Sequence, residues 1–352
     1  MKISVIICTY NYAHFLKEAL RTVAAQNYPY FELLIVDDGS SDDTEQVVAS
    51  FQNRFRQCRY LKKPHTNLGD SRNFGIAAAS GTHIAFLDAD DLWSPDYLAS
   101  MLDVFEQHPE AELVCCNCLC IQGTGLVTGS LFPPGLPSIC GPLLTPREIF
   151  DFFPFVLPSG MVFTKSLIHR IGLFQPGSPT GAEDWPWVIR AAAQGAFCVR
   201  LDRYLVLYRF HGGNLTAHRH KNFEEWLRVC EDLWRDQNVN SEAMTLARKM
   251  TRSRIPALLA RYPAATNRRL LQHALRVHGP DWILTSANWA TYLGLCPSAK
   301  VAYRLKKFLQ YFAAPPLGLI LDLQAAPEAL FASIAPQPVA ASRAAAAASK
   351  SA

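Results

Sequence analysis

The first 110 residues alternate between short apolar runs and segments whose apolar residues recur at helical spacing. The runs Ile3–Cys8 and Glu32–Asp37 show no clean alternation of polar and apolar positions. This is typical of strands buried on both faces. The pattern predicts two further strands and three helices, at Arg59–Lys62, His83–Asp88, Phe15–Gln26, Thr44–Phe51 and Ser71–Ala79. Such alternation predicts an α/β fold with a parallel, doubly wound sheet.

The remainder of the chain changes character twice. Residues 121–160 are rich in Gly and Pro, which predicts loops around a short helix from about Thr145. A helix at Glu183–Gln194 and a strand at Phe197–Tyr208 follow, and from about Asn222 the pattern is helical. We therefore expect an α/β domain over residues 1–221, a helical basic extension over 222–334 and a disordered Ala-rich tail over 335–352.

Composition excludes a disordered chain, because 49% of the residues are hydrophobic and 18% are charged. The sequence contains no run of 18 uninterrupted apolar residues, so we do not expect a membrane-spanning helix. The N-terminal segment MKISVIICTYN has no small-residue cleavage site and predicts a first strand, not a signal peptide. We expect a cytoplasmic protein.

Four of the ten cysteines lie close together in ELVCCNCLCI. A zinc site would need paired C-x₂-C knuckles separated by a loop. The observed spacing instead places Cys116, Cys118 and Cys120 on one face of a strand, where free cysteine packs as a small apolar residue. We expect a buried strand.

Polar clusters follow three of the predicted strands, where ligands bind in sheets of this kind. Asp88-Ala89-Asp90-Asp91 follows an apolar strand, and its carboxylates either bind Mg²⁺ or Mn²⁺ or form a solvated turn. Asp37-Asp38-Gly39-Ser40 is either an ordinary turn or a carboxylate site for a nucleobase or ribose. Tyr10, after the first strand, is either a rim tyrosine or a ring that stacks on a base.

Two further motifs carry acidic and basic side chains. Gly181-Ala182-Glu183-Asp184-Trp185 opens a helix, where acidic residues complement the helix dipole or supply a general base. His211 lies before two glycines in YRFHGGN, where it is either structural or a ligand for a metal or phosphate.

Taken together, these motifs resemble family 2 glycosyltransferases of the GT-A fold. The matching segments are SVIICTYN, LLIVDDGSSDDT, NLGDSRNFGIAAASGTHIAFLDADD, GAEDW and YRFHGGN, which span about residues 1–216. The resemblance implies an inverting, metal-dependent transfer of a sugar from a nucleotide-diphosphate donor. A Gln-x-x-Arg-Trp motif, which processive members carry, is absent from the sequence. A non-processive enzyme is therefore expected.

The resemblance also implies roles for individual residues. Thr9 and Tyr10 would line the base pocket, and Asp38 would bind the base. Arg72 would lie near the nucleotide, and Glu183 and Trp185 would contribute to the nucleotide-sugar site. Asp88 and Asp90 would form the DxD pair that holds ribose and metal. Asp184 would be the general base, and His211 would approach the metal or the diphosphate.

The resemblance further implies Mn²⁺ or Mg²⁺ as cofactor and a nucleotide-sugar donor, with a UDP-sugar as the usual case in the family. The acceptor would be a glycan or a polyprenyl-diphosphate-linked molecule in cell-surface polysaccharide synthesis. Two other classes stay open. A nucleotidyltransferase would normally show a Gly-rich phosphate loop after the first strand, where this chain has Thr9-Tyr10-Asn11-Tyr12. A non-catalytic nucleotide-sugar-binding protein need not retain the acidic residues named above.

Charge is distributed unevenly along the chain, although the formal total of +4 does not favour nucleic acid as a partner. Residues 248–310 contain twelve Lys and Arg residues and one acid, so they carry +11 and the rest of the chain carries −7. Aromatic residues are interleaved with these cations. The region is either an ordinary helical domain with a solvated basic face or a surface for anionic lipid headgroups or a lipid-linked acceptor at the inner face of the membrane.

Overall fold

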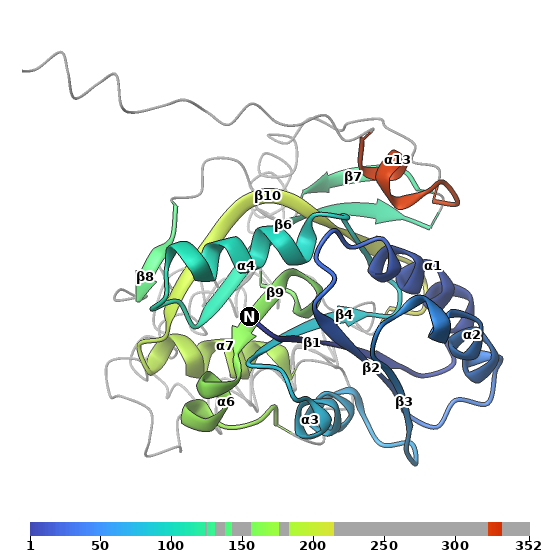
Figure 1. Ribbon diagram of the computed structural model, residues 1–352, viewed down its shortest axis with the longest axis horizontal. Helices are drawn as coiled ribbons and strands as arrows, with labels where there is room; N and C mark the ends of the chain where they lie inside the picture. The colour runs from blue at the N-terminus through green and yellow to red at the C-terminus, as the bar shows by residue number, and fades with distance from the viewer. Residues whose placement is uncertain (124, 131–137, 143–155, 176–182, 215–322, 333–352) are drawn as a thin grey trace, which may run out of the picture.

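The computed structural model describes residues 1–123, 125–130, 138–142, 156–175, 183–214 and 323–332 (Figure 1). Ten strands within these residues form one sheet, in the order β3-β2-β1-β4-β9-β6-β10-β5, with β7 paired to β6 and β8 paired to β10. The helix expected from Thr145, most of the basic extension and the Ala-rich tail lie outside the described residues.

The N-terminal half of the sheet is parallel, as the alternating pattern predicts. It comprises β1 (Ile3–Thr9), β2 (Phe31–Asp37), β3 (Cys58–Lys62) and β4 (His83–Asp88). Helices α1 (Ala13–Ala24), α2 (Thr44–Phe51) and α3 (Leu68–Ala78) connect them. Five of the seven elements differ from the predicted bounds by up to three residues at an end, and α2 and β4 agree at both ends.

The other half of the sheet corrects the expectation of a wholly parallel arrangement. Strand β9 (Met161–Thr164) runs antiparallel to both β4 and β6 (Leu113–Gln122). Strand β10 (Phe197–Phe210) pairs with β6 in parallel and with the short β5 (Leu92–Trp93) in antiparallel orientation. The sheet is therefore mixed, because β9, which follows the Gly- and Pro-rich region, enters the sheet in the reverse direction.

The remaining described elements are short strands on the edges and helices on the faces of the sheet. They are α4 (Tyr97–Gln107), β7 (Val127–Ser130), β8 (Cys140–Pro142), α6 (Lys165–Ile171), α7 (Asp184–Ala193), α13 (Pro327–Ala332) and the single 3₁₀ turns at Gln52–Arg54 and Pro158–Gly160. None of the helices in the described part of the chain is long and apolar enough to cross a membrane.

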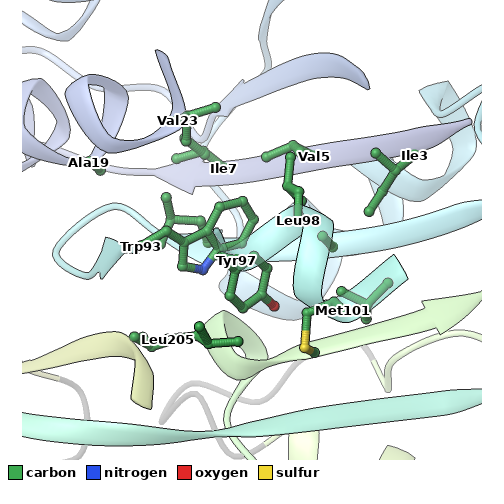
Figure 2. Close-up of a cluster of buried hydrophobic side chains, with 14 of the residues drawn as sticks. Ile3, Val5, Ile7, Ala19, Val23, Trp93, Tyr97, Leu98, Met101 and Leu205 are labelled. Carbon is green, nitrogen blue, oxygen red and sulfur yellow. The ribbon is translucent and has the colours of Figure 1, made fainter. Parts of the chain in front are cut away.

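Apolar side chains pack on both faces of the sheet. On one face, Ile3, Val5 and Ile7 of β1 contact a cluster contributed largely by α1, α2 and α4 (Figure 2). On the other face, Ile6 belongs to a cluster with residues of α3, α6 and α7. Successive residues of a strand point to opposite faces, so β1 contributes to both layers. This explains why the sequence of β1 shows no regular alternation of polar and apolar positions.

Strand β6 has the same two-sided packing, which confirms the buried-strand interpretation of the cysteine cluster. Cys116 and Cys118 lie in the layer shared with α4, and Cys115 lies in the opposite layer. Burial raises the pKa of the Cys115 thiol well above its usual range. The described cysteines are all free thiols.

Close packing of α3 on the sheet depends on a glycine. A Cβ atom at Gly75 would lie 2.6 Å from Cγ2 of Ile6 and 3.2 Å from Cγ2 of Val36. A larger residue would therefore push α3 away from β1 and β2. Because α3 carries Arg72, this contact also sets the depth of that side chain beneath the ends of the strands.

Candidate functional site

The carboxyl ends of β1, β2 and β4 meet at one edge of the sheet and bring the predicted site residues together. The pairing register places Thr9 opposite Asp37, and Cys8 opposite Asp88. The turns that follow these strands carry Tyr10, Asp38 and Asp90. Segments far apart in the sequence therefore supply side chains to one region.

Asp38 directly follows β2, and the sequence motifs did not reveal the residues that contact it. The residue is 5% exposed, and its backbone N–H donates to the carbonyl of Thr9 at 2.9 Å. Its carboxylate accepts the backbone N–H of Thr66 at 3.1 Å and forms an ion pair with Lys63, and Nδ1 of His65 lies 2.8 Å from its Oδ2. The neighbouring Asp37 instead accepts the N–H of Ser40 at 2.8 Å within the turn. Asp38 is thus the carboxylate that faces the loop after β3.

Tyr10 and His65 stack on each other next to Asp38. Their ring centroids lie 4.0 Å apart with an interplanar angle of 17°, and Tyr10 is 41% exposed. The imidazole of His65 thus lies on the face of the Tyr10 ring, and the stacking of Tyr10 on a base stays a prediction. Thr9 is 4% exposed, and its Oγ1 has no hydrogen-bond partner among the described residues.

Arg72 connects two of the predicted acidic residues. Its guanidinium is 2% exposed, forms an ion pair with Glu183 and donates to Oδ1 of Asp88 at 2.9 Å. The ring faces of Phe86 and Phe174 lie 5.5 and 5.9 Å from its Cζ. Burial alone would lower the pKa of Arg72, but the charges of Glu183, Asp88 and Asp184 outweigh it and raise that pKa. Arg72 therefore stays charged and joins the end of β4 to the start of α7.

Asp184 is the first residue of α7 and is 8% exposed. Glu183 occupies the N-cap position with its side chain fully buried. The adjacent acids thus lie in one helix start, within electrostatic range of Arg72. Trp185 also belongs to α7, but its side chain lies outside the part that the structure describes, so its expected contact with the donor stays a prediction.

Asp90, two residues after Asp88, forms a hydrogen bond with His211, which follows β10. Nε2 of His211 lies 2.9 Å from Oδ2 of Asp90, and the Asn214 amide also reaches this oxygen at 3.4 Å. The backbone N–H of Gly213 donates to Nδ1 of His211 at 3.1 Å. Since Nδ1 accepts this bond, the ring proton is assigned to Nε2, where it points at Asp90.

The third acid of the DADD turn has a different role. Asp91 is 1% exposed and accepts the Ser159 hydroxyl at 2.6 Å and the backbone N–H of Arg209 at 3.0 Å. Burial, together with the charges of Asp90 and Asp88, raises the pKa of Asp91 well above its usual range. Asp91 therefore stabilises the turn through buried hydrogen bonds, whereas Asp88 and Asp90 face the site.

Asp90 and His211 offer a carboxylate oxygen and an imidazole nitrogen, two donor types that a divalent cation such as Mn²⁺ accepts as ligands. Among the described residues no three His, Cys, Asp or Glu side chains are grouped to hold a metal by themselves. A cation at Asp90 and His211 would therefore complete its ligand set with water or with oxygens of a bound phosphate.

Tyr12 contacts the loop that carries His211, and the sequence analysis did not predict it as a site residue. Its hydroxyl donates to the carbonyl of Gly213 at 2.9 Å. Burial and the charges of Asp90 and Asp88 raise its pKa to about 12. Tyr12, Lys63, His65 and Asn214 are thus contact residues that sequence reasoning missed, and their only signal was a position in a loop after a predicted strand.

Comparison with known sequences gives one family and several relatives. Residues 4–172 match the family model described as glycosyl transferase family 2. An uncharacterized glycosyltransferase of Nostoc sp. is 30% identical over 224 residues, which are 61% of this chain and 66% of the relative. The poly(ribitol-phosphate) beta-N-acetylglucosaminyltransferase TarS of Staphylococcus aureus is 27% identical over 194 residues, 54% of this chain and 32% of the relative. The chain thus covers less than two thirds of these relatives.

Solved structures resemble the chain over a larger part of its length. The crystal structure of S. aureus TarS 1-349 has a TM-score of 0.63 at 19% identity, covering 87% of this chain and 92% of that chain. The mannosyltransferase PcManGT from Pyrobaculum calidifontis, in complex with GDP-Man and Mn²⁺, has a TM-score of 0.56 at 18% identity. It covers 88% of this chain and 84% of that chain.

Proposed function

Because the chain belongs to glycosyl transferase family 2 and has the GT-A fold, we propose that it transfers a sugar, with inversion, from a nucleotide-diphosphate donor to a hydroxyl group. The observation that carries the proposal is the grouping of Asp88, Asp90 and His211 at the end of β4, with Arg72 linking this group to the start of α7. In this proposal the charged leaving group would lie next to the grouping, and Asp184 on α7 would supply a separate carboxylate.

We propose a UDP-sugar as the donor. Structures of TarS have been solved in complex with UDP-GlcNAc and with UDP, and PcManGT was solved with GDP-Man. Tyr10 would stack on the base, and Asp38, held by Thr66, would accept a hydrogen bond from it. Asp88 would hold the ribose.

The chemistry assigned to this chain's residues is a single displacement. Asp184 would accept the proton of the acceptor hydroxyl while the acceptor oxygen bonds to the anomeric carbon. The bond from that carbon to the diphosphate breaks on the opposite side, and its electron pair leaves with the nucleotide. A base placed in this way contributes about 10²–10⁴ to the rate. Arg72 would hold Asp88 and Glu183 in place during the step.

Asp90 and His211 would hold the cation. The imidazole nitrogen favours Mn²⁺ over Mg²⁺ at this position, because Mg²⁺ takes oxygen ligands. When bound, the cation would supply positive charge that neutralises the departing diphosphate. To bind the cation through Nε2, the neutral ring of His211 would carry its proton on Nδ1 instead, in place of the hydrogen bond that Nδ1 accepts from Gly213.

For the acceptor we propose a glycan or a polyprenyl-diphosphate-linked molecule, used in cell-surface polysaccharide synthesis. Support comes from the name of TarS, a poly(ribitol-phosphate) glycosyltransferase, and from the basic composition of residues 248–310. The same composition supports peripheral contact with anionic lipid at the inner face of a membrane. Flotation with anionic and neutral vesicles at two salt concentrations tests that contact, and salt-insensitive results would contradict it.

The decisive test of the function is a thermal-shift panel of nucleotide sugars with and without Mn²⁺, followed by transfer assays with the best donor. We expect one donor to raise the melting temperature more in the presence of Mn²⁺, and release of its nucleotide to increase with acceptor. Binding without release would instead indicate a nucleotide-sugar-binding protein. Release of pyrophosphate from a nucleoside triphosphate would indicate a nucleotidyltransferase.

A further inference from the structure

Arg209, the penultimate residue of β10, holds the turn that carries the metal-binding carboxylate. Its Nε donates to the carbonyl of Asp90 at 2.8 Å, and its backbone N–H donates to Oδ1 of Asp91 at 3.0 Å. The side chain is 3% exposed and lies over the ring of Phe15, with Cζ 5.0 Å from the centroid. Arg209 is thus fixed in a buried position directly behind Asp90.

Glu18 of α1 holds Arg209 in turn. Its Oε2 accepts from a guanidinium NH₂ group of Arg209 at 2.6 Å, and its side chain is 15% exposed. A paired, mostly buried carboxylate keeps the guanidinium fork in one orientation, because both partners would lose hydrogen bonds in any other. The orientation of Asp90 therefore depends on a residue of the first helix.

The other carboxylate oxygen of Glu18 is held from the far end of the chain. Oε1 accepts from the amide of Gln324 at 2.8 Å. The guanidinium of Arg21 donates to the carbonyls of Gln324 and Ala325 at 2.8 and 3.3 Å. Glu18 and Arg21, one turn apart on α1, thus both form hydrogen bonds with the start of the segment Leu323–Ala332.

Apolar packing fixes the rest of this segment. Leu330 of α13 is 3% exposed in a cluster with Leu92, Leu119, Ile121, Val127 and Leu207. These residues belong to β5, β6, β7 and β10, and α13 lies beside β7 in Figure 1. The short helix is therefore seated on the same strands, β5 and β10, that flank the Asp90 turn.

We propose that Glu18 and Arg209 are positioning residues for Asp90, and that the segment Leu323–Ala332 completes this support through Gln324. The inference rests on the proposed role of Asp90 in metal binding. Support behind a metal ligand sets its orientation, and loss of such outer contacts typically lowers metal affinity about 10–100-fold. The chain Gln324–Glu18–Arg209–Asp90 links residues that lie up to 306 positions apart in sequence.

The test measures Mn²⁺ binding to the full chain in two ways. Binding of Mn²⁺ alone is followed by the loss of the free-ion signal in electron paramagnetic resonance. Binding in the presence of nucleotide is followed by titration of UDP at a series of Mn²⁺ concentrations. We expect the half-saturating Mn²⁺ concentration to rise about 10–100-fold in Arg209→Lys, about tenfold in Glu18→Ala and about two- to threefold in Gln324→Ala. The controls are Glu45→Ala on α2, whose carboxylate lies 3.6 Å from Lys62 at the surface, and the exposed Glu328→Ala on α13. Both should bind as wild type.

A double-mutant cycle tests the route, that is, whether Gln324 affects Mn²⁺ binding through Glu18. If Gln324 acts through Glu18, the change Gln324→Ala has no further effect on Mn²⁺ binding in the Glu18→Ala background. Variants that melt at lower temperature yet keep wild-type half-saturation below their melting points would overturn the positioning role, and additive effects would overturn the route. Wild-type protein that binds neither Mn²⁺ nor UDP would instead overturn the proposed metal site, and this inference with it.

Discussion

Arg72 and Glu183 form an ion pair in which neither side chain has appreciable contact with solvent. One belongs to α3 and the other caps α7, 111 residues later in the chain. Since Arg72 also binds Asp88 at 2.9 Å, the pair ties the helix that bears the proposed base to the strand that bears the proposed donor site. The relative positions of these two groups therefore depend on one guanidinium.

Removing the charge of Glu183 should destabilise the protein strongly. Glu183→Gln leaves part of a buried guanidinium without its anionic partner, which typically costs about 3–5 kcal/mol. Urea unfolding measures the change in the free energy of unfolding. Glu45→Gln is the control, because the exposed pair of Glu45 and Lys62 should contribute less than about 1 kcal/mol. Equal, small losses in both variants would show that the buried pair is not a major source of stability.

Asp184→Asn should separate donor binding from transfer. The amide preserves size and helix position but cannot take up the acceptor proton, so we expect the transfer rate to fall about 10²–10⁴-fold. Donor affinity, measured by calorimetry, should stay near the wild-type value. Asp96→Asn is the control, since Asp96 also occupies a helix start, at α4. Near-normal turnover of Asp184→Asn would exclude Asp184 as the base.

Asp90→Ala should abolish the dependence of donor binding on Mn²⁺. The change removes the carboxylate that lies 2.9 Å from His211 and leaves the imidazole as the sole side-chain ligand of this pair. Titration of UDP with and without Mn²⁺ measures the effect, and Asp103→Ala on the exposed side of α4 is the control. If Mn²⁺ strengthens UDP binding equally in wild type and Asp90→Ala, the metal lies elsewhere.

Local pattern was sufficient to place the residues at strand ends. Buried strands give apolar runs, and the runs before Thr9 and Asp88 stop where the sheet meets solvent, so the motifs could be assigned to one edge. The direction of β9 could not be predicted, because four residues with apolar character carry no information about which neighbour they pair with.

The partners of the motif residues were also beyond local pattern. Lys63, His65 and Thr66 surround Asp38 because the loop after β3 folds back over the end of β2. The contact between Glu18 and Arg209 joins residues 191 positions apart. Hydrophobic periodicity indicates which face of an element is buried, but it does not indicate which polar side chains meet across elements.

Tyr10→Ala should weaken nucleotide binding by about 1–3 kcal/mol, the usual contribution of one aromatic ring stacked on a base. Tyr10→Phe keeps the ring and should bind UDP nearly as wild type, which separates stacking from any role of the hydroxyl. Tyr30→Ala is the control, because Tyr30 is 64% exposed on another part of the surface. Unchanged affinity in Tyr10→Ala would place the base away from the Tyr10 and His65 rings.

His83 should make the fold sensitive to mild acid. The residue is 8% exposed in β4 and its ring lies edge-on to Phe105, 4.6 Å between centroids. Burial, with the amino-terminal charge, lowers its pKa to about 4 from an ordinary value near 6.5. Above pH 6.5 the imidazole is neutral in both states and has no effect. As the pH falls from 6.5 to 4, the unfolded state binds a proton and the folded state does not, so stability is lost over this interval.

Between pH 7.5 and pH 5 this loss amounts to about 2 kcal/mol. His83→Gln removes the titrating ring, so the variant should lose about 2 kcal/mol less than wild type over the same interval, measured by urea unfolding at both pH values. His169→Gln is the control, because His169 is exposed on α6. Parallel acid sensitivity in wild type and His83→Gln would mean that another group, not the imidazole buried in β4, governs the loss.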